Sequence, residues 1–310
     1  FGQMPQELRR KLGYNPSDAR WWYDVALALE KKAVWSLAEA AFRKAVEIDA
    51  GFALAWGGLA FLLFFRLSRT TEAEELFRRA IETDRMDPFY RVMLGNVLRD
   101  LGRYAEAEAA LRGAIEVNSE YADAWAFLGA LLADRKNRNL EAEQALQRAI
   151  QIDQADAYSW SRMAELLAKD PARAPEARSH IVKALQLKPD REWYRILFKR
   201  LCGDKFADWQ RVLPDLAAWC VANPKNIEVF DFTVRGFLQY MQLTNPADAM
   251  ALLEGLPDSR PFETLLDLFR AYADLEHLNR LAPERRALVI ELLNRLSSME
   301  TAVSDGQQDK

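Results

Sequence analysis

The sequence is short of the residues that interrupt regular structure. It holds 13 glycines and 12 prolines in 310 residues, whereas average usage of the two together is roughly 12%. This composition excludes a collagen-like or low-complexity chain. Half of the residues are hydrophobic and 47 are alanine, which favours long helices over sheets.

An excess of one charge and long hydrophobic runs are missing too. Lys and Arg number 42 against 46 Asp and Glu, a net charge of −4, whereas grooves for nucleic-acid phosphates usually show a basic balance. The apolar stretch at 52–65 is too short to span a bilayer. No signal peptide is visible, and the chain opens at Phe1. We expect a fragment or processed product in the cytoplasm, with no nucleic-acid partner and no membrane association.

Groups that carry chemistry are scarce. Cys202 and Cys220 form no CxxC pair, and His180 and His277 match no zinc-ligand pattern. Neither a GxxxxGK[ST] nor a GxGxxG phosphate loop occurs. We predict no catalytic residue, no metal site, no cofactor and no small-molecule substrate, and therefore no enzyme.

The many acidic residues have a simpler explanation than catalysis. They are interleaved with Arg and Lys, as in the run from Glu72 to Arg79. This spacing is typical of a solvated helix face with i,i+4 ion pairs.

Self-comparison reveals five segments of 34 or 35 residues, a period typical of repeat architectures. Their second halves read AEAAFRKAVEID, AEELFRRAIETD, AEAALRGAIEVN, AEQALQRAIQID and ARSHIVKALQLK. Repeats 1 to 5 are residues 19–52, 53–87, 88–121, 122–156 and 157–191.

Each repeat carries two apolar stripes at helical spacing, one in each half. The first half opens on a tryptophan, except in repeat 3, where Arg91 stands in that column with Tyr90 beside it. The tryptophans are Trp22, Trp56, Trp125 and Trp160. The second half has a column of alanines, and four residues after each alanine stands a large apolar residue. These residues are Phe42, Phe77, Leu111, Leu146 and Ile181.

Three columns of the repeat, the eighth, twentieth and twenty-seventh, hold only Ala or Gly. The eighth consists of Ala26, Ala60, Gly95, Gly129 and Ala164. Two helices approach closely only where a side chain is missing, because the side chains at the contact set the interaxial distance. Each repeat is therefore predicted to be a helical hairpin whose exposed face the next hairpin covers.

This pattern resembles the tetratricopeptide repeat (TPR) family, whose signature is W-x2-L-G-x2-Y…A-x3-F…P. Leucine replaces the tyrosine column throughout, the closing proline survives only as Pro189, and three repeats carry one extra residue between their helices. The resemblance implies an all-α fold, a right-handed α-solenoid of TPR hairpins. Repeat 3 matches best, with Leu94-Gly95, Gly102-Arg103-Tyr104, Ala107, Leu111 and Ala114.

Weaker signals predict the organisation around the five repeats of residues 19–191. Residues 1–18 are expected to hold the second helix of a truncated preceding repeat or a separate N-terminal helix. Residues 192–300 are predicted to form divergent TPR-like hairpins, beginning with a helix at 192–202. The polar residues 301–310 are expected to be a disordered tail.

The resemblance also suggests where a partner binds, because the first helix of each TPR lines the concave surface. In repeat 2, leucines already supply the packing of the hairpin, which leaves Phe61, Phe64 and Phe65 surplus. We expect a groove that holds an amphipathic helix or apolar peptide, or else the chain's own N- or C-terminal segment. The expected groove residues are Tyr23, Leu27, Phe61, Phe64, Phe65, Phe89, Val92, Asn96, Arg99, Ala130 and Tyr158.

The leading interpretation is thus a protein–protein interaction scaffold whose TPR superhelix binds a partner helix or peptide. The carboxylate clamp for chaperone tails is absent, since Tyr23 and Leu27 occupy the places of its Lys and Asn. The alternative is the sensor or regulatory portion of a larger multidomain protein, a signal-transducing ATPase or protease with catalysis elsewhere. RNA binding, as in the pentatricopeptide relatives, is disfavoured by the acidic balance and by the Trp and Gly-or-Ala columns.

Overall fold

The computed structural model describes residues 15–188, 191–202, 283, 286 and 290. Every regular element among them is helical, with eleven α-helices and one 3₁₀ turn, so the predicted all-α fold is confirmed. The chain divides into two compact units, residues 1–154 and 155–310. The helices expected beyond residue 202, the N-terminal helix and the C-terminal tail lie outside the described residues, and the predicted domain limits remain predictions.

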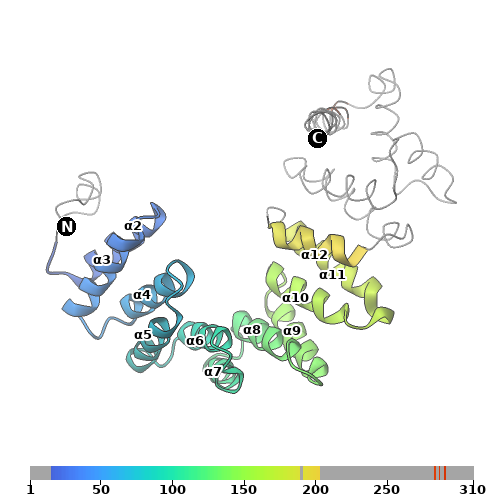
Figure 1. Ribbon diagram of the computed structural model, residues 1–310, viewed down its shortest axis with the longest axis horizontal. Helices are drawn as coiled ribbons and strands as arrows, with labels where there is room; N and C mark the ends of the chain where they lie inside the picture. The colour runs from blue at the N-terminus through green and yellow to red at the C-terminus, as the bar shows by residue number, and fades with distance from the viewer. Residues whose placement is uncertain (1–14, 189–190, 203–282, 284–285, 287–289, 291–310) are drawn as a thin grey trace, which may run out of the picture. The chain divides into compact units, whose positions relative to one another are not determined.

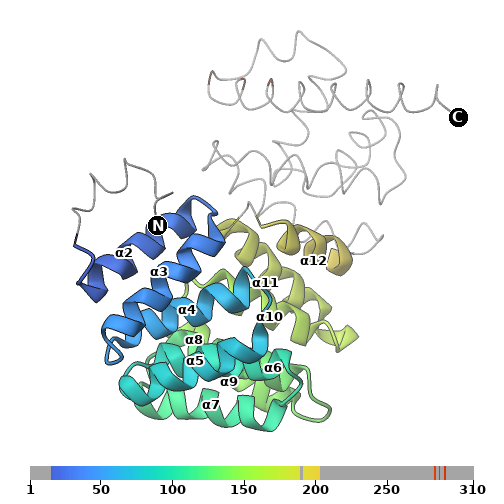
Figure 2. The same cartoon turned by 60° about the vertical axis from the view of Figure 1, so that its left-hand side comes forward.

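The first unit contains four stacked helical hairpins, one for each of repeats 1 to 4. In Figure 1 the first helices α4, α6 and α8 run along one side of this stack, and the second helices α5, α7 and α9 along the other. Figure 2 shows α2 lying along α3 within one hairpin. The helices are α2 (Ala19–Lys31), α3 (Trp35–Ile48), α4 (Ala53–Phe65), α5 (Thr70–Thr83), α6 (Pro88–Asp100), α7 (Tyr104–Val117), α8 (Ala122–Ala133) and α9 (Asn139–Ile152).

The second unit begins with the hairpin of repeat 5. Its helices are α10 (Ala157–Leu167) and α11 (Ala174–Leu187), joined through a 3₁₀ turn at Pro171–Arg173. The next helix, α12 (Glu192–Cys202), has the bounds that the sequence predicts. It packs on α11. Arg178 ties the two together, because its Nε donates a hydrogen bond to the carbonyl of Leu201 at 2.8 Å.

Within each hairpin the two helices meet at the small-residue columns. A Cβ atom on Gly95 would lie 2.7 Å from Cγ of Leu111, and one on Gly129 would lie 2.6 Å from Cγ of Leu146. The two repeats with glycine in the eighth column are thus the two with leucine on the facing helix. The other three repeats pair an alanine in the eighth column with a Phe or Ile on the facing helix. A small residue therefore faces a large one in all five repeats, although the side chains differ.

Successive hairpins interlock through a second pair of glycines on α4. The ring of Tyr90, from the next hairpin, lies directly against Gly57. A Cβ atom on Gly57 would be only 2.5 Å from Cε1 of that ring. The ring of Phe42, from the preceding hairpin, similarly faces Gly58 at 2.6 Å. Burial raises the pKa of Tyr90 to about 12, as expected for a phenol enclosed between two hairpins.

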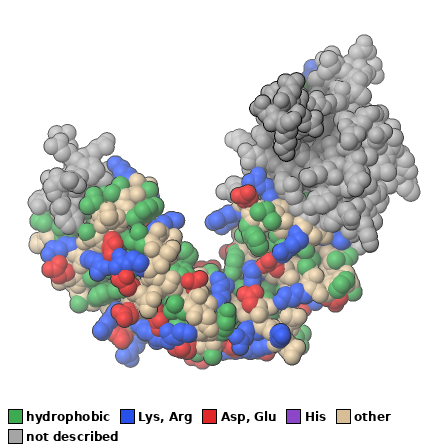
Figure 3. Space-filling view, viewed as in Figure 1, with side chains coloured by type: hydrophobic (Ala, Val, Ile, Leu, Met, Phe, Trp, Pro, Cys, Tyr) green, Lys and Arg blue, Asp and Glu red, His purple; other side chains and the backbone are tan. Residues whose placement is uncertain are grey.

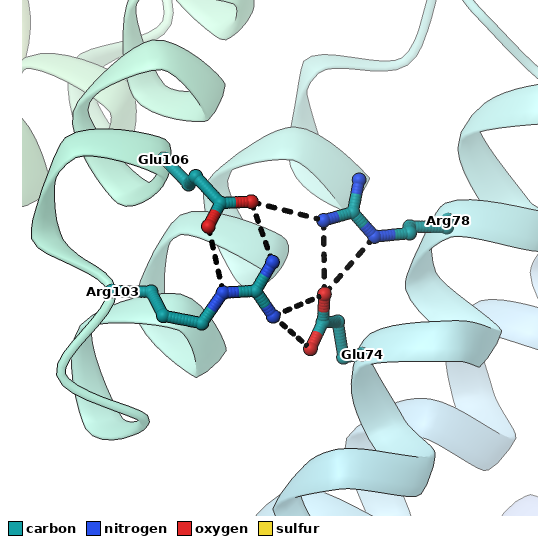
Figure 4. A network of polar contacts seen from close by, with 4 residues as sticks. All are labelled: Glu74, Arg78, Arg103 and Glu106. Atoms are coloured by element: carbon teal, nitrogen blue, oxygen red, sulfur yellow. Dashed lines mark hydrogen bonds and ion pairs between the residues drawn. The ribbon is translucent and has the colours of Figure 1, made fainter.

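A network of ion pairs closes the seam between neighbouring second helices (Figure 4). Arg103, at the start of α7, bonds Glu106 in its own helix and reaches Glu74 on α5 at 2.7 Å. Arg78 lies 2.9 Å from Glu74 and 3.6 Å from Glu106. The side chain of Glu74 is therefore buried between hairpins, not on a solvated face as its sequence spacing indicates.

The same network occurs three times in the first unit. Each copy has an Arg at the start of a second helix, a Glu three residues on, and a Glu and an Arg from the preceding hairpin. In Figure 3 blue and red side chains intermix along the lower edge of this unit. The other two copies are Arg69, Glu72, Glu39 and Arg43, and Arg138, Glu141, Glu108 and Arg112.

Substitution at the eighth column tests the contact inside a hairpin. Gly95→Ala places a methyl group against Leu111 and should cost about 1–2 kcal/mol in the free energy of unfolding, as overpacking does. The double variant Gly95→Ala/Leu111→Phe recreates the pair found in repeats 1 and 2 and should recover most of that loss. Urea denaturation of the three proteins measures both values; a single variant more stable than the parent by about 1 kcal/mol, the gain of Gly→Ala at an unobstructed helix position, would contradict the close approach.

Acid should weaken the seams. Hydrogen bonds from Arg138 and Arg112 hold the pKa of Glu108 below its ordinary value, although burial opposes them. A carboxylate with a lowered folded-state pKa stabilises the fold fully above its unfolded pKa of about 4.3, and the contribution is lost as the pH falls through the folded value. The urea concentration at the midpoint of unfolding should therefore decrease as the pH is lowered below about 4.5. This decrease should be smaller in Glu108→Gln than in the parent.

A matched control for that titration is Glu47→Gln, because among the residues that the structure describes Glu47 pairs only with Lys44, inside α3. The control should keep the parental pH dependence. If Glu108→Gln and the parent lose stability in parallel, the ion pair between hairpins contributes nothing to the seam.

Candidate partner-binding surface

Three phenylalanine rings cluster at the end of α4. The ring centroids of Phe61 and Phe65 are 4.4 Å apart, and those of Phe64 and Phe65 are 4.7 Å apart. Phe65 is 44% exposed, and the other two are half-buried. The cluster is thus packed on itself and open to solvent on one side.

The three phenylalanines of the cluster are not the residues through which α4 packs on its neighbours. Leu59, Leu62 and Leu63 are buried and supply the contacts of this helix with its neighbours. Because α4 is apolar on all sides, its remaining face also carries hydrophobic side chains. An apolar helix face that packing does not use is the usual mark of an interaction surface.

Two leucines on the first helices α2 and α4 are exposed as well. Leu27 occupies on α2 the repeat position that Phe61 occupies on α4, and it is 39% exposed. Leu54, near the start of α4, is 43% exposed. Leu27, Phe61, Phe64 and Phe65 are called the phenylalanine patch below.

One ion pair borders the patch. Nε of Arg66, the residue after Phe65, lies 3.8 Å from a carboxylate oxygen of Glu30 on α2. The same guanidinium lies 5.3 Å from the centre of the Trp35 ring on α3, within the range of a cation–π contact. Arg66 therefore connects the ends of α2, α3 and α4 next to the exposed rings.

Tyr23 lies in the seam of the first two hairpins. Its ring is half-buried against Phe42 at 5.8 Å and Phe52 at 5.4 Å. The guanidinium of Arg20 lies 5.5 Å from the ring centre. Because the ring is half-buried, Tyr23 offers only part of its surface to a ligand, and burial raises its pKa.

The groove residues expected on α6 and α8 are less accessible than those on α4. Val92 and Ala130 are fully buried and offer no surface to a partner. Asn96 is buried as well, and its amide oxygen accepts a hydrogen bond from Arg99 at 2.8 Å. The ring of Phe89 is half-buried, with its centroid 5.7 Å from that of Tyr90.

The last expected groove residue belongs to the second unit. Tyr158 lies in the first turn of α10, where its backbone N–H is capped by Asp156 at 3.0 Å. Its side chain is half-buried. It belongs to the second unit and is not part of the phenylalanine patch.

Neither a metal centre nor a membrane span is found in the described part of the chain. Within it, no three or more His, Cys, Asp or Glu side chains gather in a way that could hold a metal ion. None of the helices there is both long enough and apolar enough to cross a membrane.

The geometry defines a class: an α-solenoid of helical hairpins. Residues 92–157 match the tetratricopeptide repeat family, and together with the hairpin stacking this shows that tetratricopeptide repeats make up this part of the chain. No curated protein matches the sequence.

Solved structures of TPR proteins share the fold. Similar structures include Cut9–Hcn1 of an APC/C hetero-tetramer, with a TM-score of 0.58 and 16% identity over 76% of this chain and 46% of that one. PilF of Pseudomonas aeruginosa has a TM-score of 0.53 and 20% identity over 70% and 97%. A thermophilic TPR protein of Thermus thermophilus, TTC0263, has a TM-score of 0.51 and 20% identity over 59% and 98%.

Proposed function

We propose that this chain is a protein-interaction scaffold and that the phenylalanine patch binds an amphipathic helix of a partner protein. The TPR fold supports a scaffold role in general. The observation that carries the specific proposal is the cluster of Phe61, Phe64 and Phe65, which lies open to solvent although α4 is already packed through its leucines.

The chemistry of the patch favours an apolar helix face as the ligand. Leu27 and Phe61 lie at equivalent places on neighbouring helices, so the patch crosses from α2 to α4. A helix laid across them would present apolar residues at i, i+3, i+4 and i+7, as in other helix-in-groove complexes. Bulky aromatic anchors of this kind dominate binding energies at protein interfaces.

The variant Phe61→Ser/Phe65→Ser should weaken partner binding strongly while leaving the helices intact. We expect a loss of about 2 kcal/mol or more, roughly thirty-fold in affinity, because two aromatic anchors are removed. Both positions are at least partly exposed, so the circular dichroism signal should stay at the parental level. Affinity capture followed by a titration of the captured partner measures the change.

The matched control is Leu140→Ser, which removes an exposed apolar side chain from α9, far along the stack from the patch. It should bind the partner like the parent. Hydrogen exchange of the complex should show protection in α4. If the double variant keeps full affinity, the patch is not the binding surface; if it loses its helical signal, the rings are instead covered by a segment of this same chain.

A further inference from the structure

The phenylalanine patch has a basic border on the side of α2. Helix α4 carries no charged residue along its whole length, so a ligand on the patch meets only the charges of the neighbouring segments. Lys31 is the last residue of α2, and Lys32 is its C-cap. Both lysines are exposed.

The two lysines lie next to the exposed rings. Lys31 follows Leu27 by four residues, about one helical turn, and therefore shares its face of α2. In the repeat, Lys31 occupies the position of Phe65, and Lys32 that of Arg66. The ends of α2 and α4 are adjacent, because Arg66 reaches across to α2 at 3.8 Å.

Acidic residues do not offset this border. Glu30, beside the lysines in sequence, is the residue that Arg66 pairs with. Among the residues that the structure describes, neither Lys31 nor Lys32 forms an ion pair. Lys31 has a favourable interaction with the dipole of its own helix, but that interaction leaves its ammonium group open to a ligand.

The opposite side of the patch has no such excess. Helix α6 ends with one charge of each sign, Arg99 and Asp100. Arg99 donates to the amide oxygen of Asn96 at 2.8 Å, and Asp100 accepts from the hydroxyl of Thr70 at 3.3 Å. The positive charge is therefore concentrated where α2 and α4 end.

This charge favours a foreign ligand over the N-terminal segment of the same chain. Residues 1–14 contain Arg9, Arg10 and Lys11 against the single acidic residue Glu7. A basic segment beside two lysines is repelled, whereas an acidic one is attracted.

We propose that the patch selects an acidic amphipathic helix, one that carries glutamate or aspartate beside its apolar face and places these carboxylates over Lys31 and Lys32. This inference rests on the proposed function and adds the charge of the partner and the side on which it lies. Exposed ion pairs each contribute little affinity. The rings therefore supply most of the binding energy, and the lysines discriminate between partners and steer their approach.

Two synthetic helical peptides test the charge preference with the full chain. Both have the same length and the same Leu and Phe residues at i, i+3, i+4 and i+7, and they differ only in carrying Glu or Gln beside that face. Fluorescence anisotropy should show that the Glu peptide binds about five-fold more tightly, the gain expected from two exposed ion pairs. Added salt should reduce this preference.

The variant Lys31→Gln/Lys32→Gln should bind the two peptides equally, with the affinity that the parent has for the Gln peptide. The matched control is Lys44→Gln/Lys136→Gln, which removes the same charge from α3 and from the turn after α8. It should keep the parental preference, because neither lysine borders the patch.

The phenylalanine variant separates this inference from the function on which it rests. Phe61→Ser/Phe65→Ser should weaken both peptides. If it does so while the parent binds the two peptides equally, or while the preference persists in Lys31→Gln/Lys32→Gln, the acidic partner is wrong and the patch stands. If it binds both like the parent, the patch is not the site. A parent that binds neither peptide, as when a second copy or its own chain covers the rings, overturns both.

Discussion

The whole arrangement depends on helices that cross where a side chain is missing. In hairpins 3 and 4 the space of a Cβ on Gly95 or Gly129 is taken by a leucine of the facing helix. Once two helices lie this close, their large residues can only fill the space on either side of the crossing. The apolar stripe of each hairpin is then fixed, and the next hairpin must cover what remains.

Contacts between hairpins follow from that geometry. Tyr90 and Phe42 each insert a ring against a glycine of α4, and an Arg–Glu network repeats along the seams of the second helices. These contacts occupy the helix faces that point toward neighbouring hairpins. Side chains on the remaining face of the first helices take no part in these contacts, and on α4 they are aromatic.

The repeat period and the small-residue columns were sufficient to predict the hairpins. The helix at 192–202 was predicted without them, where the repeat pattern decays. The period and the columns were not sufficient to predict burial across a seam. Val92 lies on the expected groove face yet is buried, and Glu74 looks solvated in its helix yet bridges two hairpins. The repeat period shows which residues share a face of one helix. The burial of Val92 and Glu74 depends instead on how successive hairpins are offset, and the sequence around each residue does not indicate that offset.

Departures from the repeat proved as informative as the repeat itself. Arg91 interrupts the tryptophan column, and that column's hydrogen bond survives while its ring does not. The sequence marks the exception, but only the structure shows that the Arg91 side chain covers Gly113, with its Cδ 3.5 Å from the place of a Cβ there. The effect of an unusual residue such as Arg91 is therefore clearest when it is compared with the residues in the same column of the other repeats.

Amide hydrogen exchange across the first unit tests the stacking most directly. Helices α4 to α7 are covered by hairpins on both sides, so the account predicts that their amides exchange more slowly than those of α2, at the end of the described stack. This protection should include α4, in spite of its exposed phenylalanines. Fast exchange throughout α4 and α6, with protection confined to single isolated helices, would show that the hairpins are not held together by the contacts described.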